Sequence, residues 1–190
     1  TQTSALTYAG KDANLKTETE SWNGTNWTEV NDLSTARRSV AGAGADSTSA
    51  LAFGGESTDA HAETETWNGT NWTEVNDMNT ARQRVGGFGT NTSALVFGNN
   101  VPSGNSTATE LWNGTNWTEV NDLNTGRGYS GADGPNSTSG LAAGGETSPG
   151  TEVANTEVWN GTNWTEDGDL NTSNLGLANV GTASSALAFG

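Results

Sequence analysis

The chain has 190 residues and carries 22 Asp and Glu residues against 7 Lys and Arg residues, which gives a formal net charge of −15 at pH 7. A field of this sign repels nucleic-acid phosphates and anionic membrane surfaces, so we expect neither as a partner. The absence of Cys excludes a disulfide framework, a thiolate nucleophile and a Cys-type metal site. No apolar run is long enough for a membrane-spanning helix, so we expect no membrane insertion.

One short phrase recurs along the whole chain. The letters "WNGTNWTEV" occupy residues 22–30, 67–75 and 112–120, and "WNGTNWTE" occupies residues 159–166. The first Trp of each copy lies at 22, 67, 112 or 159, so the spacings are 45, 45 and 47 residues. We therefore predict a single repeat array over 1–190, with units centred on 22–27, 67–72, 112–117 and 159–164. Five "SAL"-type segments accompany only four Trp phrases, so either the ring closes by pairing its end strands or this array is a piece of a longer protein; we favour the second.

Within each unit, four short segments read as strands in chain order. An apolar segment such as "SALAF" or "SALVF" comes first, and a polar loop of variable length follows, for example residues 99–108. Two alternating segments, "TETETW" and "TNWTEV", then flank an Asn-Gly pair, which predicts a hairpin. A Gly-rich segment such as "RSVAGAGA" closes the unit, and helix signals are absent. Four strands in about 45 residues predict an all-β fold, a β-propeller built of four-stranded antiparallel blades with about four repeats visible.

All eight Trp residues lie in the repeated phrase, five positions apart in each copy. A two-residue or a four-residue loop would place both Trp of a copy on one face of the hairpin. We expect these pairs to be buried against a neighbouring blade, and the alternative is that they are platforms for stacking sugars. The predicted structural residues are Trp22, Trp27, Trp67, Trp72, Trp112, Trp117, Trp159 and Trp164.

These residues resemble the kelch repeat over essentially the whole chain. Its marks are a glycine doublet after an apolar strand, an aromatic residue about twelve positions later, and a Met/Leu-x-Thr-x-Arg run; here they are Gly54-Gly55 and Gly144-Gly145, Trp67, and Met78 to Arg82. The chain departs from the pattern by having Trp at the aromatic position and by breaking the doublet at Gly98-Asn99. The phrase also resembles repeats of phage tail-fibre-like and surface proteins, and this resemblance implies a location outside the cell.

Motifs for catalysis are nearly absent. The single His, His61, lies in a variable loop without a counterpart in the other units, and we expect it to be solvated. The chain contains no Gly-x-Ser-x-Gly, P-loop or His-Glu-x-x-His motif. Paired carboxylates on the Trp face raise the alternative of a glycosidase. The fourfold repetition of this pair favours a scaffold; its members are Glu20, Glu65, Glu110 and Glu157 before the first Trp, and Glu29, Glu74, Glu119 and Glu166 after the second.

Three units carry an Arg after the phrase, at Arg37, Arg82 and Arg127, and our alignment puts Ser173 there in the fourth unit. We predict that each guanidinium pairs with a Glu of the Trp face of its own or a neighbouring unit. We expect the repeated Asp residues, Asp32, Asp77, Asp122 and Asp169, to cap turns. We expect no cofactor; Ca²⁺ is the alternative, with "EDGD" at 166–169 as its best local candidate.

Together these features predict a non-enzymatic structural or attachment module on the outside of a cell or virion. Its expected partners are a cell-surface glycan or protein, or other copies or subunits of a surface assembly. The first alternative is a lectin-like propeller that binds carbohydrate through exposed Trp, and a glycosidase is the second.

Overall fold

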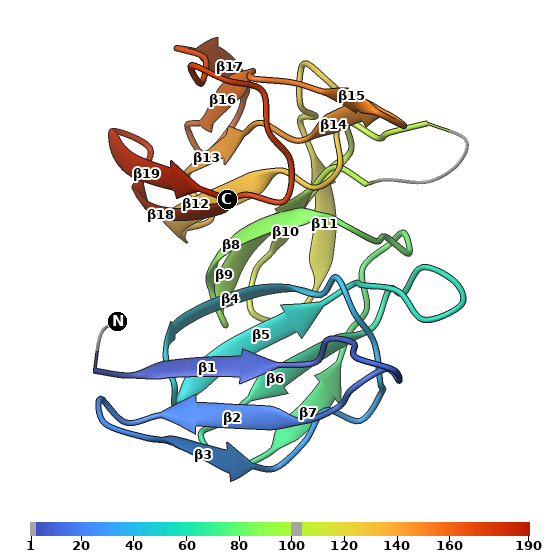
Figure 1. The fold of residues 1–190 in the computed structure, drawn as a ribbon, viewed down its shortest axis with the longest axis vertical. Helices are drawn as coiled ribbons and strands as arrows, with labels where there is room; N and C mark the ends of the chain where they lie inside the picture. Colours follow the sequence, from blue (N-terminus) through green and yellow to red (C-terminus); the bar gives the residue numbers. More distant parts are fainter. Residues whose placement is uncertain (1–2, 100–103) are drawn as a thin grey trace.

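The computed structural model describes residues 3–99 and 104–190, and it contains strands and no helix within these ranges (Figure 1). Residues 100–103 of the predicted variable loop lie outside the described part, as do residues 1 and 2 of the predicted array. No helix of the described chain is long and apolar enough to cross a membrane.

Three four-stranded antiparallel sheets repeat along the chain, which confirms the predicted all-β class and the repeated four-stranded sheets. Sheet 2 contains β4 (Ala41–Asp46), β5 (Ser49–Phe53), β6 (Thr64–Trp67) and β7 (Trp72–Val75). Sheet 3 contains β8 (Gly86–Thr90), β9 (Ser93–Phe97), β10 (Thr109–Trp112) and β11 (Trp117–Val120). Sheet 4 contains β12 (Gly131–Asn136), β13 (Ser139–Ala143), β16 (Thr156–Trp159) and β17 (Trp164–Asp167).

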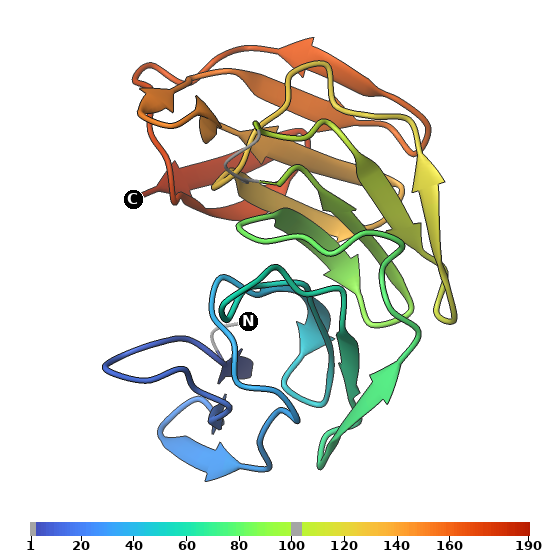
Figure 2. The same cartoon turned by 90° about the vertical axis from the view of Figure 1, so that its right-hand side faces the viewer.

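Two smaller sheets flank these three. Sheet 1 contains β1 (Ala5–Tyr8), β2 (Thr19–Trp22) and β3 (Trp27–Val30), and sheet 5 contains β18 (Ala178–Thr182) and β19 (Ser185–Phe189). A short hairpin of β14 (Glu146–Ser148) and β15 (Thr151–Glu152) lies in the loop of sheet 4. The sheets follow one another in an arc, and no strand pairing joins sheet 5 to sheet 1 within the described residues (Figure 2).

The Gly-rich segments form the predicted fourth strand, but the unit boundary drawn from the sequence is wrong. Each Gly-rich strand pairs with the apolar strand that follows it, so β4 joins β5 rather than the preceding hairpin. The reason is the short link between them: the backbone N–H and hydroxyl of Thr48 both donate to Oδ1 of Asp46, at 2.8 and 2.6 Å. This tight turn fixes β4 and β5 as neighbours in one sheet.

The Trp hairpin has a four-residue loop, because Trp22 and Trp27 are direct cross-strand partners. Oδ1 of Asn23 accepts hydrogen bonds from the N–H groups of Thr25 and Asn26, both at 2.9 Å. Gly24 has a φ of 93°, a conformation that side chains with a Cβ rarely adopt. The same loop recurs in the other three copies, and each places its two Trp rings side by side with centroids 5.4 or 5.5 Å apart.

Each sheet has two different faces. In sheet 2, Ala50 is the cross-strand partner of Trp67 and Ala52 that of Glu65, so these residues share one side, which we call the Trp face. Leu51 and its neighbour two positions on, Phe53, lie on the opposite side, which we call the Leu face. The Leu face of each sheet packs on the Trp face of the next, and this stacking builds the two buried clusters of the core.

Candidate functional site: the repeated inter-sheet contact

The Trp pairs of sheets 2, 3 and 4 lie between sheets. The first Trp of each is almost completely buried: Trp67, Trp112 and Trp159 are 2%, 2% and 1% exposed. The indole Nε1 of each of these residues donates one hydrogen bond of 2.9 Å to a backbone oxygen. The acceptor lies in the turn that precedes the apolar strand of the same sheet. The first Trp therefore ties the hairpin to the remainder of its sheet.

The second Trp of each pair makes the contact with the preceding sheet. Trp117 is 5% exposed, and its ring packs edge-on against Phe53 of sheet 2 with centroids 5.0 Å apart. Its Nε1 donates to Oγ1 of Thr64, also in sheet 2, at 3.0 Å. The same two contacts recur at the other boundaries, as Trp72 with Tyr8 and Thr19, and as Trp164 with Phe97 and Thr109.

A buried ion pair accompanies each Trp contact. Nη2 of Arg82 lies 2.8 Å from Oε1 of Glu110, in the next sheet, and the two side chains are 3% and 0% exposed. Nη1 of Arg82 also donates to the backbone oxygen of Ala108 at 2.7 Å. The expected pairing of Arg82 with a Trp-face carboxylate is thus present, and the partner comes from the neighbouring unit. The pairs Arg37–Glu65 and Arg127–Glu157 repeat it at 2.9 and 2.7 Å.

The second carboxylate oxygen of each buried Glu is also used. Oε2 of Glu110 accepts hydrogen bonds from the backbone N–H and the side-chain amide of Asn79, both at 2.8 Å. Glu157 is held in the same way by Asn124, whereas Glu65 accepts from the backbone N–H of Ser34. Burial lowers the pKa of the Arg127 guanidinium although Glu157 opposes the change. Each buried carboxylate is therefore paired and hydrogen-bonded by groups of the neighbouring unit, which compensates for the cost of burying its charge.

Asn174, not Ser173, occupies the Arg position in the fourth unit. Its backbone oxygen accepts from the N–H of Gly145 at 2.8 Å, just as the backbone oxygen of Arg82 accepts from Gly55 at 2.9 Å. The alignment from the sequence was therefore wrong by one residue. The ten-residue spacing from the second Trp to the Arg, as from Trp72 to Arg82, already leads from Trp164 to Asn174. The amide side chain brings no charge to the boundary between sheets 4 and 5.

Sheet 1 presents the Trp face with no preceding sheet against it in the described chain. Trp27 is 48% exposed and Trp22 is half-buried, whereas the equivalent residues of sheets 3 and 4 are buried. Glu20, the counterpart of the buried carboxylates, is exposed. A sugar-stacking surface therefore has one candidate location among the described Trp pairs, at Trp22 and Trp27.

The second set of repeated carboxylates lies in surroundings different from those of the buried set. Glu29, Glu74, Glu119 and Glu166 are exposed on the outer strand of each sheet, while Glu65, Glu110 and Glu157 are held in ion pairs. His61 is not solvated as expected: its ring lies between Ser57 and Glu63, at 2.8 and 2.9 Å, and its side chain is 14% exposed.

Each repeated Asp binds the start of its own hairpin. Oδ1 of Asp77 accepts from the backbone N–H of Thr64 at 3.3 Å, and Asp32, Asp122 and Asp169 do the same for Thr19, Thr109 and Thr156. Asp169 of the "EDGD" candidate is thus engaged in the turn. Among the described residues, no group of three or more His, Cys, Asp or Glu is placed to hold a metal ion.

Sequence reasoning missed several residues of the contact. Asn76 donates its side-chain amide to the backbone oxygen of Thr115 and to Oδ1 of Asn116 in the turn of the next hairpin, at 3.0 and 2.8 Å. Asn31 and Asn121 make the same link at the other boundaries. These three Asn residues directly follow the phrase, and Gly168 replaces Asn in the fourth unit. Their recurrence at the repeat period is the feature of the sequence from which the contact could have been predicted.

Asp133 on β12 is a half-buried residue at a position where sheets 2 and 3 have Ala43 and Phe88. Burial raises its pKa, and its Oδ2 has no hydrogen-bond partner. A raised pKa in the folded state means that the folded protein binds more protons than the unfolded chain at mildly acidic pH. The charged carboxylate therefore lowers stability at neutral pH, and this penalty disappears as pH falls below the ordinary range of Asp.

We expect Asp133→Asn to raise the melting temperature at pH 7 by at most roughly 2–4 °C, the shift that corresponds to about 1 kcal/mol in a domain of this size, because solvent screens part of the charge of a half-buried carboxylate. The gain should shrink towards zero as pH falls to about 3, below the ordinary pKa of Asp. Thermal unfolding followed by circular dichroism at several pH values measures this effect. Asp59→Asn, in an exposed loop, is the control. A gain of equal size at every pH would contradict the assignment to the carboxylate charge.

No protein-family model matches the chain, and no curated protein matches it either.

Proposed function

We propose that this chain is a non-enzymatic, propeller-type scaffold of the kelch kind, acting as a structural or attachment module on a cell or virion surface. The observation that carries the proposal is the repeated contact: the Trp pairs of sheets 2 to 4 and the three Arg–Glu pairs that accompany them lie between sheets. Residues kept for a ligand would need to be accessible, whereas these are enclosed and mutually paired. The repeated phrase therefore serves assembly of the fold.

The arrangement of strands supports the propeller. The Gly-rich strands β4, β8, β12 and β18 contact one another in succession, while the Trp hairpins lie at the other side of each sheet. Sheets that converge at their first strands and diverge at their last are typical of blades around an axis. The resemblance to phage tail-fibre-like surface repeats suggests the extracellular or virion-surface location.

The outer strands offer the surface for attachment. In each of sheets 1 to 4 the outer strand exposes a Thr-Glu pair, at Thr28-Glu29, Thr73-Glu74, Thr118-Glu119 and Thr165-Glu166. Four equal and weak contacts at fixed spacing can multiply binding through avidity without any new kind of contact. A cell-surface protein or other subunits of a surface assembly would bind to these exposed Thr and Glu side chains.

The lectin alternative is tested at Trp22 and Trp27, the most exposed Trp pair among the described residues. We expect the chain, displayed in many copies on beads, to show no binding on an array of cell-surface glycans that depends on Trp27. Trp27→Ala is the informative variant because this ring is 48% exposed, and Glu29→Gln is a matched control on the same strand. A glycan signal that is lost in Trp27→Ala and kept in Glu29→Gln would replace the scaffold proposal with the lectin.

A further inference from the structure

The variable part of the repeat lies at one end of the molecule, which we call the loop end (Figure 1). It consists of the loops before the Trp hairpins and the links between sheets, among them residues 9–18, 54–63 and 144–155 and residues 31–40, 76–85 and 121–130. The ten-residue loops 9–18 and 54–63 differ at eight positions, whereas "WNGTNWTE" is identical in all four units. In repeat proteins, variation of this kind is typical of the face that binds a partner.

The basic residues of the chain also gather at the loop end. All seven lie in its loops and links, at Lys11, Lys16, Arg37, Arg38, Arg82, Arg84 and Arg127. Three of the five arginines are enclosed in the ion pairs between sheets. The side chains of Arg38 and Arg84 are 39% and 25% exposed. These two are therefore the guanidinium groups that a ligand can reach from solvent.

Arg38 and Arg84 converge on one carboxylate oxygen. Nε of Arg84 donates to Oε1 of Glu56 at 3.1 Å, and the hydroxyl of Ser39 donates to the same oxygen at 3.3 Å. Nε of Arg38 lies 3.2 Å from this oxygen but makes no hydrogen bond to it. Within the described chain, the Nη groups of Arg38 have no hydrogen-bond partner either. Two guanidinium charges thus meet one carboxylate here, and the fork of Arg38 is left to bind another anion.

Three links have a residue with a side chain in a left-handed backbone conformation. Ser39, Arg84 and Tyr129 have φ values of 53°, 56° and 55°, and the equivalent residue of the next link is Gly176, with a φ of 69°. The N–H of Tyr129 donates to the backbone oxygen of Arg84, and that of Gly176 to Tyr129, both at 2.8 Å. Glycine adopts this conformation without strain, so the other three side chains are kept at a conformational cost. Such strain is typical of functional positions.

The strained side chains bring an aromatic ring to the two arginines. The guanidinium carbon of Arg84 lies 5.0 Å from the centre of the Tyr129 ring, and this ring is half-buried. An accessible guanidinium fork beside an aromatic surface suits a ligand that carries both a carboxylate and a ring with apolar C–H groups. A carboxylated sugar has both features.

We propose that the loop end binds the carboxylate group of an acidic sugar through Arg38 and Arg84, beside the ring of Tyr129. The Nη groups of Arg38 bind the two carboxylate oxygens, and the ring of Tyr129 contacts the sugar. Salt screens charges that are more than about 8 Å away, so the acidic groups elsewhere on the chain do not prevent this contact. The site uses neither the exposed Thr-Glu pairs nor Trp27, and so goes beyond the scaffold function proposed above.

The test titrates the 190-residue chain with methyl β-D-glucuronide and follows the side-chain Nε–Hε signals of arginine by NMR. The chain has five Arg residues, and the three enclosed ones provide internal reference signals. We expect saturable shifts of the Arg38 and Arg84 signals, with the other three signals unchanged. Absence of saturable shifts, or equal shifts of all five signals, overturns the proposal.

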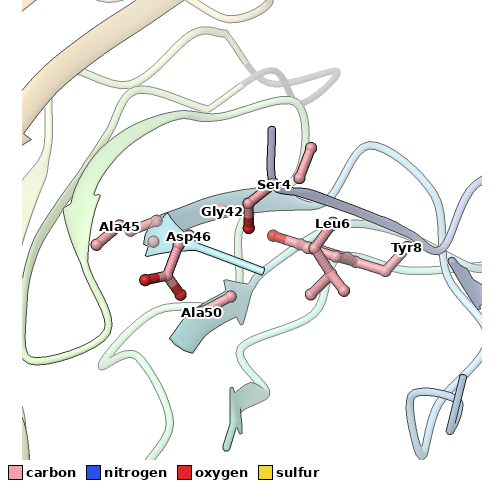
Figure 3. Close-up of a pocket in the computed structure, with 10 residues that line it drawn as sticks. Ser4, Leu6, Tyr8, Gly42, Ala45, Asp46 and Ala50 are labelled. Carbon is pink, nitrogen blue, oxygen red and sulfur yellow. The ribbon is translucent and has the colours of Figure 1, made fainter. Parts of the chain in front are cut away.

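Two further probes distinguish the sugar from its charge. Methyl β-D-glucoside lacks the carboxylate and should leave both signals unchanged, whereas acetate lacks the ring and should bind more weakly than the glucuronide. An open cavity of ≈ 270 Å³ between β1 and β4 has no Lys or Arg among the described residues that line it, so a neutral sugar bound there would not mimic the effect (Figure 3). Shifts of the two signals by the glucoside, or equal affinity for acetate, overturn the assignment to an acidic sugar.

Arg38→Gln removes the charge and the fork from a partly exposed position. It should weaken glucuronide binding at least about tenfold, the effect of losing hydrogen bonds to a charged group. Lys16→Gln is the matched control, because Lys16 is another partly exposed cation of the loop end, and its affinity should equal that of the parent. If Arg38→Gln does not fold by circular dichroism, Arg38→Lys, which keeps the charge without the fork, should also weaken binding. Unchanged affinity in the Arg38 variant, or an equal loss in Lys16→Gln, overturns the proposal.

Tyr129→Gly tests the role of the ring, since the equivalent Gly176 shows that the backbone accepts glycine at this position. The variant should bind the glucuronide more weakly than the parent. A ring that only supports the link would change the melting temperature and leave the affinity unchanged, and that result would remove Tyr129 from the site. None of these measurements involves Trp27, so their failure leaves the scaffold proposal standing.

Discussion

Replacing Arg82 with Met is expected to lower the free energy of unfolding by about 3–5 kcal/mol, the usual cost of leaving one member of a buried ion pair without its partner. The variant keeps most of the side-chain volume, so the loss reports the charge rather than a cavity. Glu110 would remain buried at 0% exposure with only the two hydrogen bonds from Asn79. Urea denaturation followed by circular dichroism measures the change.

The double variant Arg82→Met/Glu110→Leu distinguishes the net contribution of the ion pair from the cost of leaving one charge unpaired. Replacing both charges with apolar groups removes the unpaired carboxylate, so most of the lost stability should return. Lys16→Met is the control for surface pairs, because Lys16 contacts Asp12 and Glu18 in an exposed loop, and it should change stability little. An Arg82→Met chain that unfolds at the urea concentration of the parent would show that the ion pair is not structural.

The second large effect is expected at Trp117. Trp117→Ala should cost about 3–5 kcal/mol, because truncating a large core aromatic loses its transfer free energy and leaves a cavity. Here it also removes the ring contacts to Phe53 and Trp112, at 5.0 and 5.4 Å, and leaves Oγ1 of Thr64 without the indole donor. The midpoint of urea unfolding by circular dichroism is again the measurement.

Trp27→Ala is the matched control, since it removes the same residue from the same position of the repeat where no preceding sheet covers it. With 48% of its surface exposed, Trp27 should contribute clearly less than Trp117. Equal losses in the two variants would show that the indole stabilises its own hairpin rather than the contact between sheets.

The sequence allowed prediction of several local features. The hairpin, the shared face of its two Trp and the Gly-rich fourth strand follow from Asn-Gly turns, from the two-residue period of a strand and from the 45-residue repeat. The Arg–Glu pairing was also accessible, because charges that recur at one period have equivalent surroundings in each unit.

Other features depend on contacts between units, and a repeating sequence does not show which unit supplies each partner. Glu65 and Glu110 each follow a Thr and lie two positions before the first Trp of the same phrase, so nothing in the pattern says that Arg82 pairs with Glu110 of the next unit rather than Glu65 of its own. The assignment of each Gly-rich strand to the following sheet was missed for the same reason, because any cut through a repeating pattern gives equally regular units. The partner of Arg82 and the sheet to which each Gly-rich strand belongs become clear only when the Leu face of one sheet is stacked on the Trp face of the next.

The inter-sheet contact has a consequence for how such a protein changes in evolution. All three boundaries between sheets 1 and 4 use equivalent positions, and the acceptor of the second indole is Oγ1 of a Thr at each of them. Removing residues 83–127, one 45-residue unit, would bring Phe53 against Trp164 and Arg82 against Glu157 with no new kind of contact required. Recombination between the near-identical copies can therefore lengthen or shorten the array in whole units, and the size of the module is free to vary while its architecture stays fixed.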